Sequence, residues 1–315
     1  MRRAIAGIAL GLALVLAAAP AAAAEKPTSR IGDHVFGESD LVPLPIPSTN
    51  LMTSLGAGGA PNVDVEVFEW ADSIPTRTID GSLTYLTLRL GYQQAVNDWL
   101  APWASINVAG RIGTNSVSIV SEGVPYQYSW ELGWLIKVRE WEHARLGATL
   151  NLWNSTWGVV DLGQWLRDAI AAGGIDETNE LYRTNRSLTG GAGLRYAHAV
   201  NATFGWAAAV EGGVGEPPNR LESTRGFFRG GVIGDFDLAP ARGVPIGIAL
   251  GYRYESFPGL EPNVTWRSNQ GLVRIGYTGR EEFGVALETQ LGSVPLSNGQ
   301  STVVIQTRLT TRYYF

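Results

Sequence analysis

The chain has 315 residues, no cysteine and a formal net charge of −5. The lack of cysteine excludes a disulfide framework, cysteine-ligated zinc and iron–sulfur clusters, and the acidic balance offers no polybasic surface for nucleic acid. We therefore expect no metal, no cofactor and no nucleic-acid partner.

Residues 1–24 have the pattern of a cleaved secretory signal peptide. Arg2 and Arg3 precede an apolar stretch that ends at Ala18, and Ala22-Ala23-Ala24 offers a small-residue cleavage site. An uncleaved helical anchor is the alternative, but the stretch is short and is followed by Pro20. Cleavage would leave about 290 residues, enough for one large barrel or two small soluble domains.

Residues 25–61 lack the alternation of a strand. The run from Leu41 to Pro47 contains three prolines, which is too many for a central strand. Two interpretations stay open, a Pro-rich periplasmic tail, which is the simpler one, or a plug inside the domain that follows.

From residue 62 onward, segments of about ten residues alternate apolar and polar side chains. After the signal peptide, no stretch of 18 consecutive apolar residues occurs, so membrane-spanning helices are not expected. The alternation predicts twelve strands, at residues 62–71, 83–93, 99–111, 127–139, 145–156, 187–197, 202–212, 226–237, 245–256, 269–278, 283–291 and 302–315.

The last of these strands is amphipathic and ends on the C-terminal Phe315. Val303, Ile305 and Leu309 share one face, whereas Gln306 and Arg308 lie on the other. This terminus resembles the signature of Gram-negative outer-membrane β-barrel proteins of the porin-like kind, with no subfamily matched. The resemblance implies an all-β fold for residues 62–315, a closed antiparallel up-and-down transmembrane barrel in the bacterial outer membrane. It also implies contact with outer-membrane lipid and lipopolysaccharide, and delivery to the barrel-assembly machinery through the C-terminal strand.

Loop lengths and aromatic positions agree with that architecture. Counted back from a periplasmic C-terminus, the periplasmic connections are short and the outer ones long, such as 157–186. A soluble β-sandwich or barrel with an aromatic core is the alternative. The residues expected in an outward aromatic girdle at the periplasmic strand ends are Tyr92, Tyr196, Tyr277, Phe283, Tyr313 and Phe315.

Because successive side chains of a strand point to opposite faces, many charged residues of the predicted strands are expected to point into the lumen. Two hypotheses follow, an arginine track that guides anions, or a mutually paired network that fills the barrel. Twelve strands lie between filled eight-stranded barrels and wide porins, so any passage is expected to be narrow. The residues predicted to line it and set selectivity are Arg89, Arg111, Arg195, Arg229, Arg253, Arg274, Arg308, Glu131 and Glu288.

The connection 157–186 carries a candidate gate. Residues 161–170 show the spacing of a short amphipathic helix, with Trp165, Leu166, Arg167 and Asp168 at its centre. This loop resembles, in position only, the constriction loop of porins. An external cap over the barrel is the alternative.

The sequence gives little support for an enzyme. The three histidines, His34, His143 and His198, are expected to be solvated turn residues rather than general bases. The acidic pair Asp235 and Asp237 shares one strand face near the periplasmic end, where arginines can neutralise it without a metal. No conventional catalytic motif occurs in the chain.

We therefore expect a monomeric barrel that acts as a narrow porin-like channel for passive passage of small polar or anionic solutes. A structural or surface-binding barrel with a plugged lumen is the second hypothesis. An outer-membrane enzyme is the third.

Overall fold

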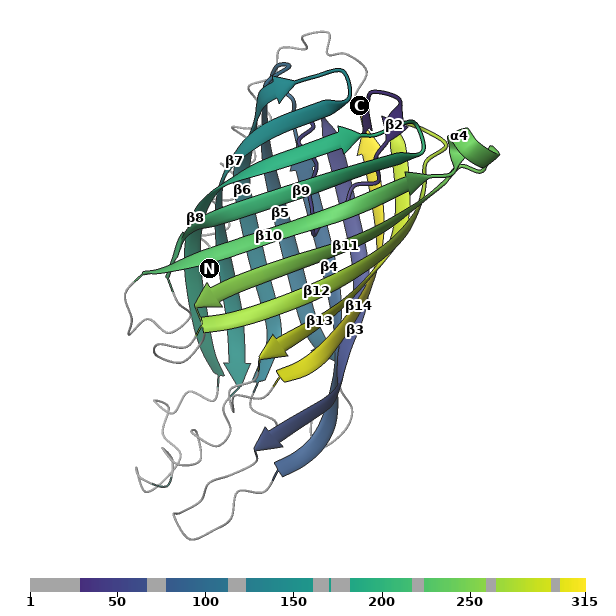
Figure 1. Cartoon of the computed structure of the whole chain (residues 1–315). Helices are drawn as coiled ribbons and strands as arrows, with labels where there is room; N and C mark the ends of the chain where they lie inside the picture. Colours follow the sequence, from purple (N-terminus) through teal and green to yellow (C-terminus); the bar gives the residue numbers. More distant parts are fainter. Residues whose placement is uncertain are drawn as a thin grey trace.

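A computed structural model of the chain describes residues 29–66, 78–112, 123–160, 170, 182–216, 224–258, 265–295 and 301–315. Within these residues, twelve antiparallel strands form one closed barrel (Figure 1). The all-β fold class and the strand number expected from the sequence are confirmed.

The twelve strands overlap the predicted segments in order. Chain neighbours pair with one another, and β14 closes the barrel against β3, with Tyr314 opposite Asn50. The barrel strands are β3 (Asn50–Glu66), β4 (Thr78–Gln93), β5 (Leu100–Ile112), β6 (Gly123–Glu140), β7 (Ala144–Val160), β8 (Tyr182–Ala199), β9 (Phe204–Gly215), β10 (Arg225–Asp237), β11 (Ile246–Pro258), β12 (Thr265–Tyr277), β13 (Phe283–Pro295) and β14 (Ser301–Tyr314).

The start of β3 differs from the prediction. This strand begins at Asn50 and not at residue 62, so residues 50–61 belong to the barrel. Glycines hide its alternation, because large side chains from neighbouring strands occupy the inner face. A Cβ at Gly58 would lie 2.5 Å from Cζ of Tyr85, and one at Gly56 would lie 2.7 Å from Cγ of Arg308.

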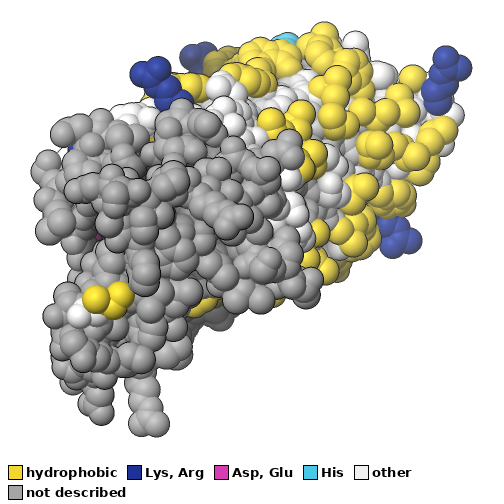
Figure 2. All heavy atoms as spheres, turned by 90° about the horizontal axis from the view of Figure 1, so that it is seen from below, with side chains coloured by type: hydrophobic (Ala, Val, Ile, Leu, Met, Phe, Trp, Pro, Cys, Tyr) yellow, Lys and Arg dark blue, Asp and Glu magenta, His cyan; other side chains and the backbone are white. Residues whose placement is uncertain are grey.

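The outer face of the barrel is apolar. On β4, Leu86, Leu88 and Leu90 point outward and are 44–47% exposed, while Thr87 and Arg89 between them point into the lumen. Figure 2 shows hydrophobic side chains gathered over the outer side of the barrel. Closure leaves no unpaired strand edge, so the backbone hydrogen bonds of the barrel are satisfied without water, as a bilayer requires. Among the described residues, no helix is long and apolar enough to cross a membrane.

Short connections join the strands at the end of the barrel that carries the C-terminus, for example 141–143 between β6 and β7. We call this end periplasmic, following the resemblance. One of these connections contains the short helix α4 (Ala239–Arg242), which ends at Gly243 with a φ of 66°. The connections at the opposite end, where long loops are expected, fall largely outside the described residues.

Residues 29–49, which we call the plug, lie inside the periplasmic half of the barrel (Figure 1). They begin with a small hairpin of β1 (Arg30–Ile31) and β2 (His34–Val35) and continue as extended chain. Of the two interpretations left open by the sequence, the contacts place this segment in the lumen and not in a tail. Apolar plug side chains and inner-face residues of β8 to β12 form one buried cluster, which contains Ile31, Phe36, Leu41, Val42, Leu44, Ile46, Ala197, Ala199, Ala207, Ile233, Ala249 and Leu272.

Candidate functional site: the lumen and its plug

The lumen beyond the plug holds a cavity of about 770 Å³. The plug lines one end of it through Asp40 and Leu41, and inward-facing strand residues line the sides. Charged groups, amides and aromatic rings share the lining. The lining residues discussed below are Arg89, Trp103, Glu131, Arg195, Glu211, Arg229, Arg253, Gln290 and Arg308.

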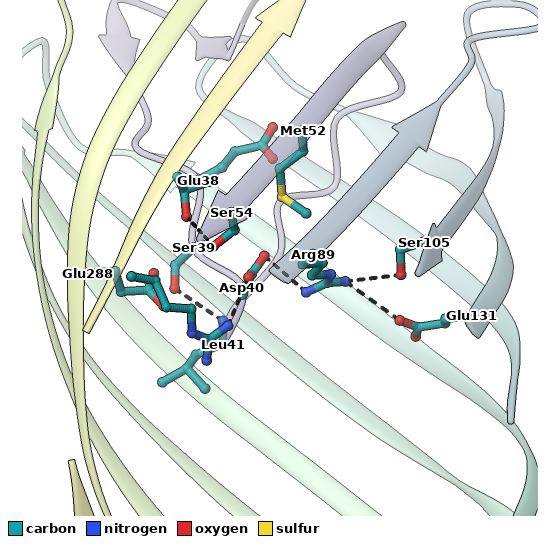
Figure 3. A network of polar contacts seen from close by, with 12 residues as sticks. Glu38, Ser39, Asp40, Leu41, Met52, Ser54, Arg89, Ser105, Glu131 and Glu288 are labelled. Carbon is teal, nitrogen blue, oxygen red and sulfur yellow. Dashed lines mark hydrogen bonds and ion pairs between the residues drawn. The ribbon is translucent and has the colours of Figure 1, made fainter. Parts of the chain in front are cut away.

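Asp40 of the plug bridges two arginines of the barrel. Its Oδ1 lies 3.1 Å from Nη1 of Arg89 on β4, and its Oδ2 accepts a 3.0 Å hydrogen bond from Nη1 of Arg308 on β14. Figure 3 shows Asp40 and Arg89 turned toward one another, with Glu131 of β6 on the far side of the guanidinium. The plug therefore supplies a carboxylate that two arginines of the lumen hold.

The ion pairs continue across the lumen. Arg89 Nη2 lies 3.7 Å from Glu131, whose other oxygen lies 3.6 Å from Nη2 of Arg229. Arg229 also donates a 2.6 Å hydrogen bond to Glu211. We call this group the central network; its members are Asp40, Arg89, Glu131, Glu211, Arg229 and Arg308. It links the plug to β4, β6, β9, β10 and β14, so the paired network expected as one alternative is present in the lumen.

Burial and the neighbouring charges have opposite effects on the pKa of Asp40. Burial favours the protonated acid, but the Arg89 and Arg308 guanidiniums outweigh it and hold the pKa of Asp40 below its usual value. Asp40 is therefore ionised at neutral pH. Its negative charge is a fixed part of the closed lumen.

The remaining arginines predicted to line a passage lie in different surroundings. Arg253 pairs with Glu255, and Arg195 lies 5.9 Å from the ring centre of Trp103. Arg111 lines the cavity at the end of β5. Arg274 and Glu288 were also predicted to line the passage. Both point inward, but they are only 5% and 4% exposed and do not line the cavity.

A second group of polar contacts holds the start of the plug. His34 is fully buried, with Nδ1 3.1 Å from the carbonyl oxygen of Ala202 and Nε2 3.2 Å from Oδ1 of Asp235. The backbone N–H of Gly37 donates to Oδ2 of the same carboxylate at 3.1 Å. A carbonyl oxygen only accepts, so in the contact with Ala202 the Nδ1 of His34 is the donor. Because it is buried against β10, His34 is not the solvated turn residue that the sequence suggested.

The aromatic residues expected in a girdle lie at the periplasmic end. Tyr92 and Phe315 stack with ring centres 6.4 Å apart, and Phe315 and Tyr313 stack at 5.8 Å. Tyr196 packs 5.2 Å from Trp206. Tyr277 and Phe283 are exposed on the outer face.

Sequence reasoning missed the functional side chains of the plug. Asp40 and Glu38 lie in a segment without periodicity, so no parity rule assigns them a direction. Glu38 accepts a 2.8 Å hydrogen bond from the Tyr314 hydroxyl and pairs with Arg312. The predicted gate residues Trp165, Leu166, Arg167 and Asp168 lie outside the described residues.

Comparisons with known proteins agree with the architecture. No protein-family model and no curated protein sequence matches the chain. Among solved structures, an outer-membrane channel from Pseudomonas putida F1 is 13% identical over 89% of this chain and all of that one, with a TM-score of 0.50. The P. putida toluene transporter TodX is 12% identical over 92% of this chain and 98% of that one, with a TM-score of 0.43. The β domain of the Bordetella autotransporter BrkA is 11% identical over 85% of this chain and all of that one, with a TM-score of 0.47.

A closed twelve-stranded barrel, an apolar outer face and aromatic rings at the strand ends together define the class of protein. The chain is a β-barrel protein of the bacterial outer membrane. The likeness to the channel of P. putida F1 concerns the fold alone.

Proposed function

We propose that the protein is an outer-membrane channel for small polar solutes, with the plug controlling its periplasmic mouth. One observation carries the proposal. The cavity of about 770 Å³ is lined in part by the plug, a segment of chain that belongs to none of the barrel strands. Among the described residues, the covalent chain joins the plug to the barrel only at β3, so a shift of the plug would leave the strand pairing intact.

The lining favours polar solutes over hydrocarbons. A hydrocarbon held beside the central network would take water from guanidinium and carboxylate groups and return no hydrogen bond. TodX is described as a toluene transporter, but Arg89, Arg229 and Arg308 on this lining support a different solute class. Since all three arginines are already paired with acids, any preference for anions is expected to be modest.

A structural or surface-binding barrel with a closed lumen is the second candidate. The observation that favours it is the set of buried polar contacts holding the plug, above all those of Asp235 with His34 and Gly37. A lumen that never opens would show the same contacts.

We also propose a passive rather than a catalytic role, and a monomer surrounded by lipid and lipopolysaccharide. Recognition by the barrel-assembly machinery would use β14, whose last residues carry the outward rings of Tyr313 and Phe315. The apolar outer face supports the contact with lipid.

Single-channel recording tests the channel. The refolded chain is placed in a planar bilayer, and a potassium chloride gradient reports ion selectivity from the reversal potential. We expect discrete steps of current with a small reversal potential of the anion-selective sign. Persistent silence from a correctly folded barrel would favour the closed-lumen alternative.

A further inference from the structure

We infer that Arg89 and Arg308 form a carboxylate-binding site, which Asp40 fills when the plug is docked and which the carboxylate of a small monoanionic solute fills in its place. Solute binding and docking of the plug at this point then exclude one another. The inference deepens the proposed channel function, and it names the solute class as small monocarboxylates.

The two halves of the site belong to separate parts of the molecule. Arg308 is held by the barrel, because its Nη2 donates a 2.6 Å hydrogen bond to Gln290 of β13. Arg89 is held near Ser105 of β5, 3.5 Å from its hydroxyl, and by its ion pair with Glu131. Both guanidiniums therefore keep barrel partners that fix their positions when Asp40 leaves.

The geometry suits one carboxylate. Each oxygen of Asp40 faces a different guanidinium, from strands on either side of β3. Gly56 of β3 leaves room for the stem of Arg308, because a Cβ there would lie 2.7 Å from Arg308 Cγ. Two planar cations around a single charge match a carboxylate, and Glu131 beside Arg89 disfavours a doubly charged anion.

A solute is able to reach the site from the cavity. Asp40, Arg89 and Arg308 all line the cavity, and the side chain of Asp40 is 11% exposed. The rest of the solute would lie along the lining near Arg195 and Trp103. Because one carboxylate replaces another, the arginines lose no charged hydrogen bond in the exchange, and the solute concentration decides which one is bound.

The other anchors of the plug do not involve this site. His34 and Gly37 are bonded to Asp235, and Glu38 is bonded to Tyr314. Loss of the Asp40 contacts therefore loosens the segment next to Asp40, while the hairpin and the buried side chains of Val42 and Leu44 stay in place.

The absence of cysteine in the chain makes a direct test possible. Ser39, which is 3% exposed, is replaced in a Ser39→Cys variant of the full chain, and its maleimide labelling rate is measured in acetate at constant ionic strength. Acetamide, which is neutral, and chloride, which is an anion without a carboxylate, serve as control solutes at the same concentration. Val96→Cys, in an exposed turn, controls for changes in thiol reactivity.

We expect saturating acetate to raise the labelling rate of Ser39→Cys by about 10- to 100-fold, the change that loss of one charged hydrogen-bond pair produces. Adding Asp40→Asn should raise the rate without acetate and remove the response to it. Equal rates in acetate, acetamide and chloride, or full protection in the Asp40→Asn variant, would overturn the inference.

A recording from the unaltered chain does not depend on how the variants fold. When acetate replaces chloride, openings should last longer. A chain that conducts but shows no response to acetate refutes the carboxylate site and leaves the channel standing. Labelling that responds to acetate in a chain that never conducts refutes the channel and leaves the site standing.

Discussion

Replacement of Asp235 by alanine is expected to weaken docking of the plug strongly. The carboxylate is 1% exposed and accepts from two buried donors, Nε2 of His34 at 3.2 Å and the backbone N–H of Gly37 at 3.1 Å. A buried donor left without an acceptor costs about 1–3 kcal/mol, so the two together cost about 2–6 kcal/mol. In Asp235→Asn, the amide oxygen still accepts from Gly37 and the amide N–H donates to Nε2 of a neutral His34, so the expected cost is smaller.

The assay is protection of a cysteine at position 39 from maleimide, compared between variants in the same background. Each factor of ten in labelling rate corresponds to about 1.4 kcal/mol of docking free energy, so Asp235→Ala should label about 30-fold faster or more. The barrel itself should keep its heat-dependent migration on gels, because the strands stay paired. Glu255→Gln, also on the inner face but outside the plug contacts, is the matched control. Unchanged protection in Asp235→Ala would refute the assignment of Asp235 as an anchor of the plug.

Two further predictions concern the plug. In Gly37→Ala, the new Cβ would overlap the guanidinium of Arg274 and lie 2.9 Å from Oδ2 of Asp235. Either the buried Arg274 side chain or the plug must shift, and recorded openings should become more frequent. Gly110→Ala, whose Cβ would meet nothing within 4 Å, should leave the currents unchanged, and equal behaviour of the two variants would contradict the packing of the plug. The second prediction is a pH profile. Because its pKa is lowered in the docked state, Asp40 stabilises docking above its ordinary pKa of about 3.9, and this stabilisation is lost as the pH falls through the docked-state pKa. Channel opening should therefore rise below about pH 4, whereas opening that does not change as the pH falls to about 3 would contradict this role of Asp40.

The strands could be predicted because the bilayer imposes a period of two on them. Leu86, Leu88 and Leu90 must face lipid, so Thr87 and Arg89 between them must face inward. The start of β3 could not be predicted, because glycines at positions such as 56 and 58 have no side chain to show a period. Glycine is required at these two positions because Arg308 and Tyr85 on the neighbouring strands occupy the space of a side chain.

The site could be predicted only in part. The alternation of side chains along a strand shows that Arg89, Arg229 and Arg308 point into the lumen. It does not show which acid lies opposite each of them across the lumen. The plug has no period at all, and its position depends on contacts with residues far along the chain, such as the bond between His34 and Asp235. Asp40 was therefore absent from the predicted lining, although it holds two of the predicted arginines.

The most direct test of the central claim is single-channel recording from a chain with its plug tied to the barrel. A Cβ at Gly147 would lie 3.2 Å from that of Pro45, close to the separation of about 3.5–4.5 Å in disulfides, so Pro45→Cys with Gly147→Cys should form a bridge. The account predicts silence in the oxidised protein and discrete current steps after reduction. Equal currents before and after reduction would contradict control of the channel by the plug.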